Sequence, residues 1–338
     1  METLCLTADA ESVKKAAALL RAGQVVAFPT ETVYGLGADA LNAEAVRRIF
    51  AAKERPADNP LIVHVADPAQ LTDLCRITDT AQALMEAYWP GPLTLLLKKT
   101  DRVPSVTTAG LASVAVRCPQ HPVALALLRE CALPIAAPSA NRSGRPSPTT
   151  ARHVREDMQG RIPLILDGGA CRVGVESTVV DLTGSAPCVL RPGAVTPAMI
   201  ARIAGDCAVA PSVMRPLHEG ESAPSPGMRH RHYAPRGKMT VFVGDEARVQ
   251  REIMARYDRA ENACILAHTP TLPAYGRRRA YSLGATPEET AQLLFQRLRE
   301  MDEEGYSLIL AQGWEEEGVA LAVMNRMARA AAFDIVRL

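Results

Sequence analysis

The stretch PTETVYGLGAD occupies residues 29–39 and directly follows a short apolar run, Val25 to Phe28, that predicts a buried strand. Two hydroxyls, a carboxylate, a phenol and two glycines follow one another within this stretch. A loop of this composition at a strand end can bring backbone and polar groups close to a ligand, although an ordinary strand-to-helix turn would use the same residues. The glycine spacing matches neither the dinucleotide motif GxGxxG nor the phosphate-binding motif GxxxxGK[ST].

Composition describes a globular protein with room for two domains. The chain has 338 residues, 48% of them hydrophobic and 22% charged, with a net charge of +1. That charge predicts no strong general attraction to nucleic acid or membrane. Residues 1–238 carry 26 basic and 22 acidic side chains, whereas residues 239–338 carry 12 and 15. An anionic ligand is therefore expected in the first part of the chain.

Cysteine usage and the N-terminus indicate the compartment. The eight cysteines form no CxxC pair, which argues against a zinc site or a disulfide framework and favours a reducing cytosol. The first nine residues lack the basic and apolar regions of a signal peptide. No apolar run approaches the roughly 20 residues of a membrane span. We expect a soluble, cytoplasmic protein without membrane contact.

Residues 1–211 mix helical and strand patterns without strict alternation, which predicts an α/β domain with a mixed sheet. Capping residues, prolines and apolar periodicity mark the helices, and short apolar runs mark the strands. Helices are expected at 11–22, 42–54, 79–89 and 121–131 and from 68 and 197, and strands at 25–28, 61–65, 93–97, 113–119, 134–137, 163–166, 178–182 and 188–191.

Residues 212–238 have the proline-rich composition of a linker. Their second half, 227–238, is basic and contains no acidic residue, and it includes Tyr233. A passive linker needs neither the charge nor the aromatic ring.

Residues 239–338 show a second alternation, which predicts a small parallel three-layer domain of Rossmann type. Thr286-Pro287-Glu288-Glu289 is a capping box that opens one of its helices. Without GxGxxG or clustered acids and histidines, this domain is expected to be non-catalytic. Strands are predicted at 239–243, 263–267, 307–311 and 333–338, and helices at 246–257, 286–301 and 318–332.

The polar groups at element ends of the first domain together resemble an anion site. Arginine can hold carboxylate or phosphate through two hydrogen bonds, and lysine acts as a compact charge. Such an inventory suits a phosphorylated ligand together with a carboxylate ligand. The cations are Lys53, Arg55, Arg117, Arg145 and Arg191, and the neutral groups are Thr30, Thr32, Ser139, Asn141, Ser143, Ser147, Ser177 and Thr178.

Each group also has a purely structural explanation. Lys53 and Arg55 stand where a helix C-terminus favours cations, and His64 within an apolar strand can be an interior histidine. Arg117 and Arg191 can be surface residues at strand ends. No GxSxG elbow is present, so we expect a reaction without a covalent enzyme intermediate. No aspartate cluster is present, so any Mg²⁺ would be held mainly by substrate phosphates and water.

Several stretches together closely resemble the YrdC-like domain of L-threonylcarbamoyladenylate synthases. Residues 225–235, SPGMRHRHYAP, and the domain after them are similar to the longer two-domain form. The resemblance spans nearly the whole chain, in the family's order. Its motifs are PTETVYGLGADA at 29–40, KERPADNPLIVHV at 53–65, PGPLTLLL at 90–97, VAVRCP at 114–119, APSANRSGRPSPT at 137–149, GVESTVVDL at 174–182 and LRPGAV at 190–195.

The resemblance implies a reaction and a fold. L-threonine, bicarbonate or CO₂, and ATP, with Mg²⁺, would give threonylcarbamoyl-AMP and pyrophosphate. Transferase machinery would then move the threonylcarbamoyl group to adenosine 37 of tRNAs that read codons beginning with A, and a weak tRNA contact is conceivable. The implied fold is a twisted mixed sheet around a central basic cavity, followed by a Rossmann-like domain.

The resemblance also implies roles for residues, with Lys53 and Arg55 as the catalytic pair that counters the triphosphate charge. Residues 212–238 would fold over the site as a lid. Glu54, between the two cations, is expected to point to solvent. The implied threonine-binding residues are Thr32, His64, Arg117, Ala137 and Ser177, and the implied ATP-binding residues are Lys53, Arg55, Asn59, Ser113, Ser139, Asn141, Ser147, Arg191 and Tyr233.

Two alternatives remain open from the sequence. A YrdC-like cavity could grip tRNA or double-stranded RNA by charge alone, although the first part carries few excess charges and no aromatic platform. The other alternative is a carbamoyl-handling domain like that of hydrogenase-maturation carbamoyltransferases. Those proteins carry cysteine-rich zinc fingers, whereas this chain has no CxxC pair.

Overall fold

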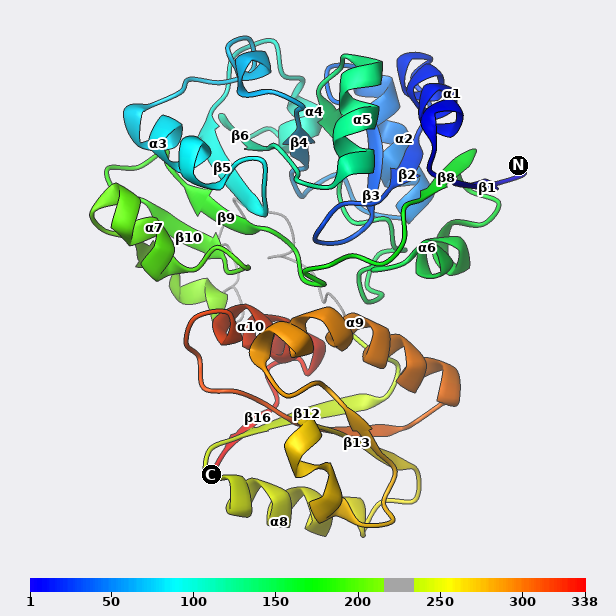
Figure 1. The fold of residues 1–338 in the computed structure, drawn as a ribbon, viewed down its shortest axis with the longest axis vertical. Helices are drawn as coiled ribbons and strands as arrows, with labels where there is room; N and C mark the ends of the chain where they lie inside the picture. The colour runs from blue at the N-terminus through cyan, green and yellow to red at the C-terminus, as the bar shows by residue number, and fades with distance from the viewer. Residues whose placement is uncertain (216–233) are drawn as a thin grey trace.

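The computed structural model describes residues 1–215 and 234–338, which form two α/β domains stacked along the long axis of the molecule (Figure 1). The predicted lid falls largely on residues 216–233, so its central part and Tyr233 lie outside the described residues. Among the described residues, no helix is both long enough and apolar enough to cross a membrane.

The first domain is built on a mixed sheet, as predicted. Its strand order is β1-β8-β2-β3-β7-β4-β6-β5-β9-β10-β11, with parallel and antiparallel neighbours intermixed. The strands are β1 Leu4–Thr7, β2 Val26–Phe28, β3 Gly35–Asp39, β4 Ile62–His64, β5 Leu93–Lys98, β6 Ser113–Arg117, β7 Ile135–Ala136, β8 Leu164–Asp167, β9 Thr178–Asp181, β10 Cys188–Arg191 and β11 Ala208–Val209.

Helices cover both faces of this sheet. Helices α1 and α5 pack together and bury one apolar cluster, while α2, α3 and α6 bury a larger one on the other face (Figure 1). The helices are α1 Ala10–Arg21, α2 Ala43–Lys53, α3 Asp79–Tyr88, α4 Ser105–Thr108, α5 Pro122–Cys131, α6 Ala151–Met158 and α7 Pro197–Ala204, with 3₁₀ turns at Pro68–Leu71 and Pro211–Val213.

The second half of the opening stretch is a strand rather than a loop. Gly35–Asp39 forms β3 and pairs antiparallel with β2, so the stretch supplies the turn and the second strand of a hairpin within the sheet. Glycine is required at position 37, since a Cβ there would lie 2.7 Å from the Phe28 ring and 2.8 Å from Ile135. The sequence prediction missed this strand because two of its five residues are glycines, which are depleted in strands.

The second domain has the predicted parallel three-layer architecture. Its sheet order is β14-β13-β15-β12-β16, and α9 and α10 cover the face towards the first domain while α8 covers the other (Figure 1). The elements are β12 Lys238–Val243, α8 Glu246–Tyr257, β13 Ala263–Ala267, a 3₁₀ turn Thr269–Tyr275, β14 Ala280–Ser282, α9 Pro287–Glu304, β15 Leu308–Gln312, α10 Ala320–Ala330 and β16 Ile335–Arg337.

Contacts between the domains are apolar as well as polar. Val33 from the β2–β3 hairpin and Val175 belong to the same buried cluster as the core side chains of α9 and α10. The sheet of the first domain includes β11, which pairs parallel with β10, while the domain end near residue 211 stays a prediction.

Candidate active site

A cavity opens at one end of the strands of the first sheet, where the ends of several strands meet. The C-terminal ends of β4 and β6 carry His64 and Arg117, and the antiparallel β5 and parallel β9 begin at the same edge. His64 and Arg117 share a sheet face with Ile62 and Ala115 because side chains alternate along a strand. The cavity is partly open to solvent, and its lining includes Thr30, Thr32, Val33, Gly35, Arg55, Ile62, His64, Arg117, Ala137, Pro138, Ser139, Asn141, Glu176, Ser177 and Arg191.

Arg117 is held by a buried carboxylate that the sequence prediction did not include. Its Nη2 donates to Oε1 of Glu31 over 2.6 Å, and its Nη1 donates to the Thr32 hydroxyl over 3.0 Å. Burial raises the pKa of Glu31, but the charge and hydrogen bond of Arg117 outweigh it and hold that pKa below its ordinary value. Arg117 therefore reaches the cavity as half of an ion pair, and Thr32 is oriented by it.

His64 is an uncharged hydrogen-bonding group in the cavity wall. Burial, reinforced by the nearby charge of Arg117, lowers its pKa to about 3. Its Nδ1 lies 3.2 Å from the carbonyl oxygen of Ile62, and the Phe28 ring meets it edge-on. In the tautomer in which Nδ1 donates to that carbonyl, Nε2 is left as an acceptor. His64 is buried, as the interpretation of an interior histidine predicts, but its ring also lines the cavity.

Lys53 lies behind the loop that follows β7 rather than among the lining residues. Its amino group donates to the carbonyl oxygens of Ser139 and Asn141, the latter over 2.6 Å. Burial, and then the charge of Arg55, places the pKa of Lys53 well below its ordinary value. These contacts shape the 139–141 loop, and the phosphate role expected for Lys53 stays a prediction.

Arg55 forms the adjoining part of the cavity wall, and Asn59 is buried next to it. Arg55 lines the cavity, and its Nη2 donates to the carbonyl oxygen of Asn59 over 3.1 Å. The side-chain amide of Asn59 is fully buried and has no hydrogen-bond partner among the described residues. An unsatisfied buried amide costs about 1–3 kcal/mol, so this group is suited to a partner that the chain itself does not supply.

The 139–141 loop is internally cross-linked. The Ser139 hydroxyl donates to Oδ1 of Asn141 over 2.5 Å, and Nδ2 of Asn141 donates to the carbonyl oxygens of Arg142 and Arg145. The loop therefore has a defined shape beyond that of a simple turn, and its backbone borders the cavity.

Ser177 and Arg191 close the opposite wall. Nη2 of Arg191 donates to the Ser177 hydroxyl over 3.1 Å, and its Nε donates to the Ser177 carbonyl oxygen over 3.0 Å. The same hydroxyl lies 2.7 Å from that of Thr94 on β5. Arg191 is buried, so the surface position considered for it from the sequence is wrong, and the same holds for Arg117.

Glu176 is a lining carboxylate that the sequence prediction did not include. Its Oε1 accepts from the Ser147 hydroxyl over 2.6 Å, and its Oε2 accepts from Nε of Arg326 over 2.7 Å. Burial opposes ionisation, but the charges of Arg326 and Arg191 bring the pKa of Glu176 to about 2. Ser147 is fully buried beneath this carboxylate instead of lining the cavity.

Two further residues named in the sequence prediction, Ser113 and Glu54, do not line the cavity. Ser113 begins β6, at the opposite end of the strand from Arg117, so the structure does not bring it to the cavity. Glu54 turns outward, where its carboxylate accepts from Arg142 over 2.6 Å and pairs with Arg161 over 2.8 Å. That orientation agrees with the expectation for Glu54.

The two acids that the sequence prediction omitted, Glu31 and Glu176, are each adjacent in sequence to a predicted site residue. Glu31 precedes Thr32, and Glu176 precedes Ser177. A carboxylate next to a site otherwise rich in cations signals an internal counter-ion. The arginine that pairs with each acid lies far along the chain, so no local pattern indicates it.

No cluster of three or more histidine, cysteine or acidic side chains that could hold a metal ion occurs in the described parts of the chain. Both carboxylate oxygens of Glu176 already accept from other side chains. These walls suit a metal that arrives with the phosphates of a ligand better than one held in a protein cage.

Fold and cavity together define a two-domain α/β protein with a buried, arginine-lined ligand site on its first sheet. Two family models match the chain: Sua5/YciO/YrdC, described as "Telomere recombination", over residues 18–193, and "Threonylcarbamoyl-AMP synthase, C-terminal domain" over residues 195–332. The chain belongs to the Sua5/YciO/YrdC family, in its two-domain form. The predicted resemblance is thereby confirmed.

Relatives match across both domains. Threonylcarbamoyl-AMP synthase of Pyrococcus abyssi is 46% identical over 96% of each chain, and that of Bacillus subtilis is 44% identical over 98% of this chain and 96% of the relative. The crystal structure of P. abyssi Sua5 complexed with L-threonine is 45% identical, covers 100% of this chain and 99% of its own, and has a TM-score of 0.93.

Proposed function

We propose that this protein catalyses the formation of threonylcarbamoyl-AMP and pyrophosphate from L-threonine, bicarbonate or CO₂, and ATP. The observation that carries the proposal is the division of one cavity into two chemical halves. One half is a small pocket with a neutral histidine and an arginine already paired to an acid. The other half is bordered by a cross-linked polar loop and two arginines.

The first half suits an amino acid. Arg117 has N–H groups beyond those that hold Glu31, Thr32 and Gly91, and these could bind a carboxylate. The uncharged His64 can accept a hydrogen bond from a hydroxyl or an ammonium group through Nε2. Ala137 and Ser177 complete the wall, and the crystal structure of the P. abyssi relative with bound L-threonine supports this assignment.

The second half suits a nucleotide triphosphate. Arg55 and Arg191 supply positive charge, and Ser139 and Asn141 supply hydrogen-bonding groups on the loop that Lys53 supports. The orphaned amide of Asn59 lies next to Arg55 and could bind the nucleotide. Lys53 and Arg55 remain our candidates for the catalytic pair, with Arg55 in contact and Lys53 shaping the loop. Ser113 has no place in this scheme, and Tyr233 remains a prediction.

The chemistry follows from positioning and charge. The amine of threonine would add to CO₂ and lose a proton, which gives a carbamate on the nitrogen. An oxygen of this carbamate would then form a bond to the α-phosphorus of ATP while the bond from that phosphorus to the bridging oxygen breaks, and pyrophosphate leaves. Holding both reactants in one cavity removes most of the entropic barrier, and the arginines stabilise the charge that develops on the leaving group. Mg²⁺ bound to the phosphates would neutralise part of the same charge.

The product would be consumed by transferase machinery that modifies adenosine 37 of tRNAs reading codons beginning with A, in the cytoplasm. Residues 212–238 would act as a lid that excludes water from a hydrolysable adenylate.

Pyrophosphate release from ATP by the purified full chain tests the function. We expect release only when L-threonine, bicarbonate and Mg²⁺ are all present, with serine a much poorer substrate. Release that continues unchanged without threonine would contradict the proposal. Salt-dependent tRNA binding without ATP consumption would favour the RNA-binding alternative, and ATP cleavage that requires carbamoyl phosphate would favour the carbamoyltransferase alternative.

A further inference from the structure

Two arginines of the second domain are buried at the junction with the first. Arg299 on α9 and Arg326 on α10 are the largest fully buried side chains of the described residues, with exposures of 1% and 0%. Burying a guanidinium is costly unless charged partners compensate it. The acidic partners of both arginines belong to the first domain, close to the cavity, whereas Asn325 of α10 also accepts from Arg326.

Arg326 reaches the cavity wall itself. Its Nε donates to Glu176 over 2.7 Å, and its Nη2 donates to the carbonyl oxygen of Pro192 over 3.2 Å. Glu176 lines the cavity and receives the Ser147 hydroxyl, while Pro192 directly follows Arg191. One guanidinium of the second domain thus holds the wall at Glu176 and the backbone next to a lining arginine.

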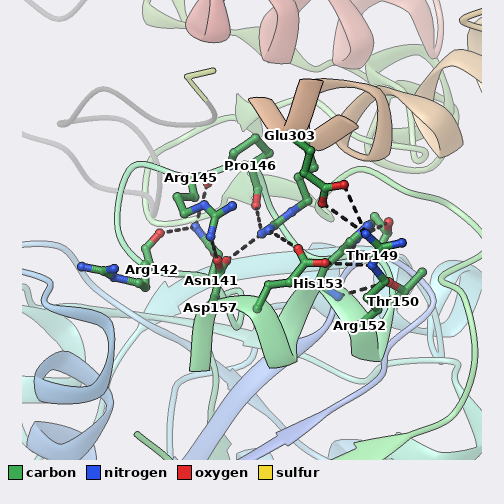
Figure 2. A network of polar contacts seen from close by, with 12 residues as sticks. Asn141, Arg142, Arg145, Pro146, Thr149, Thr150, Arg152, His153, Asp157 and Glu303 are labelled. Carbon is green, nitrogen blue, oxygen red and sulfur yellow. Dashed lines mark hydrogen bonds and ion pairs between the residues drawn. The ribbon is translucent and has the colours of Figure 1, made fainter. Parts of the chain in front are cut away.

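Arg299 holds the segment that follows the 139–141 loop of the cavity. Its Nη2 donates to the carbonyl oxygen of Pro146 over 2.6 Å and to Oδ2 of Asp157 over 2.7 Å. The other oxygen of Asp157 accepts from Arg145. Figure 2 shows Arg145 and Pro146 above Asp157, on the side of the first domain that faces α9.

The network continues into the cavity loop. The backbone carbonyl of Arg145 accepts from Nδ2 of Asn141, the residue whose Oδ1 lies beside Ser139 and Lys53 (Figure 2). A connected path of hydrogen bonds therefore runs from α9 through residues 145–146 to the cavity. A second path runs from α10 through Glu176 to Ser147, which ends the same segment.

The surrounding interface is closely packed, so these contacts have little freedom to shift. A Cβ added to Gly174 would lie 2.3 Å from the carbonyl oxygen of Ala291 on α9. Val175, next in sequence, is fully buried in the core shared with α9 and α10. The backbone that leads into Glu176 and Ser177 is thus pressed directly against the second domain.

We propose that Arg299 and Arg326 are positioning residues for the nucleotide half of the cavity, and that the second domain thereby completes the active site without touching substrate. This inference rests on the proposed function for the identity of the nucleotide. Arg299 acts on the 141–147 segment, and Arg326 acts on Glu176 and the Arg191 wall.

The test uses the full chain and measures ATP binding separately from turnover. The variants are Arg299→Gln and Arg326→Gln, with Arg297→Gln as the control. Arg297 is also on α9, but it contacts Ser282 and Glu300 of its own domain. Calorimetric titration with Mg-ATP gives the dissociation constant, pyrophosphate release gives kcat and both KM values, and circular dichroism with thermal melting verifies folding.

We expect Arg299→Gln to weaken ATP binding about tenfold or more while the KM for threonine changes less than about threefold, because its path reaches only the loop. Arg326→Gln should weaken ATP binding similarly and also lower kcat, because Glu176 borders both halves. Arg299→Lys and Arg326→Lys keep the charge and should recover part of the affinity. Arg297→Gln should bind ATP as the unaltered protein does.

Folded Gln variants with an ATP dissociation constant within about twofold of the unaltered protein would overturn the inference. Where a Gln variant does not fold, the Lys variant decides: unchanged ATP affinity there would overturn it equally. A protein that binds ATP but releases no pyrophosphate with threonine and bicarbonate contradicts the proposed function instead, and leaves the binding comparison valid.

Discussion

Nε of Arg326 lies 2.7 Å from Oε2 of Glu176, although 150 residues separate the two in the chain. One belongs to a helix of the second domain and the other to the wall of a cavity in the first. Both side chains are buried, and the pair holds Glu176 ionised beside Ser147 and Arg191. The two domains are consequently joined through charges at the site itself as well as through apolar packing.

The close approach at Gly174 predicts a specific loss of stability. Gly174→Ala combines a left-handed backbone, φ +81°, with a clash against the α9 backbone, so we expect a loss of about 3 kcal/mol or more in the free energy of unfolding. Gly205→Ala is the control, because Gly205 has φ +82° and no atom near the added Cβ; it should cost only about 1 kcal/mol. Urea denaturation measures both, and equal losses would show that the contact with α9 is unimportant.

The buried pair of Arg117 and Glu31 predicts strong coupling. Arg117→Gln should destabilise the protein by about 3–5 kcal/mol, because it leaves Glu31 as an uncompensated buried charge. The double variant Arg117→Gln with Glu31→Gln should lose less than the sum of the two single variants. Denaturation of all four proteins gives the coupling energy, and additive losses would contradict the pairing.

The position of Lys53 predicts that its loss acts through the loop. Lys53→Met removes the donors to Ser139 and Asn141, so we expect kcat/KM for ATP to fall about 100-fold, as misplacement of a binding loop by about 1 Å can cause. Lys14→Met, at an exposed position on α1, should leave turnover unchanged. Near-normal turnover by Lys53→Met would remove both Lys53 and the loop from the mechanism.

The pKa of His64 predicts a dependence of stability on pH. Its folded pKa of about 3 lies below the ordinary 6.5, so between these values the unfolded state binds the proton and the folded state does not. Stability therefore falls as the pH drops below about 6.5, with a contribution from His64 of up to about 1.4 kcal/mol per pH unit.

His64→Gln cannot take up this proton, so its unfolding free energy should fall less steeply between pH 6.5 and 4.5. That window lies above the range in which Glu31 and Glu176, whose pKa values are lowered, lose their contribution. His153 and His268 also have lowered pKa values, but they titrate in both proteins and cancel in the comparison. Parallel slopes for the two proteins would contradict the assignment.

Local patterns predicted most elements of the fold. The cap at Asn42, the apolar spacing that follows it and the end near Glu54 agree with α2. The strand and helix limits of α8 and β13 were also predicted correctly from alternation alone. Such signals depend on neighbours within a few residues, so the chain itself displays them. The exceptions were β3, with its two glycines, α6, hidden in a polar sequence, and the short elements β1, α4, β11 and β14.

The sequence by itself determined the family, the two-domain order and most of the residues that line the cavity, because contiguous motifs carry them. Only the tertiary structure decided what those residues do to one another. It turned Lys53 behind the loop, paired Arg117 with Glu31, moved Ser113 to the far end of its strand and joined Glu176 to Arg326. Charge compensation in a buried site acts between residues that are distant in the chain, so the hairpin at residues 29–39 could mark the site without revealing its partners.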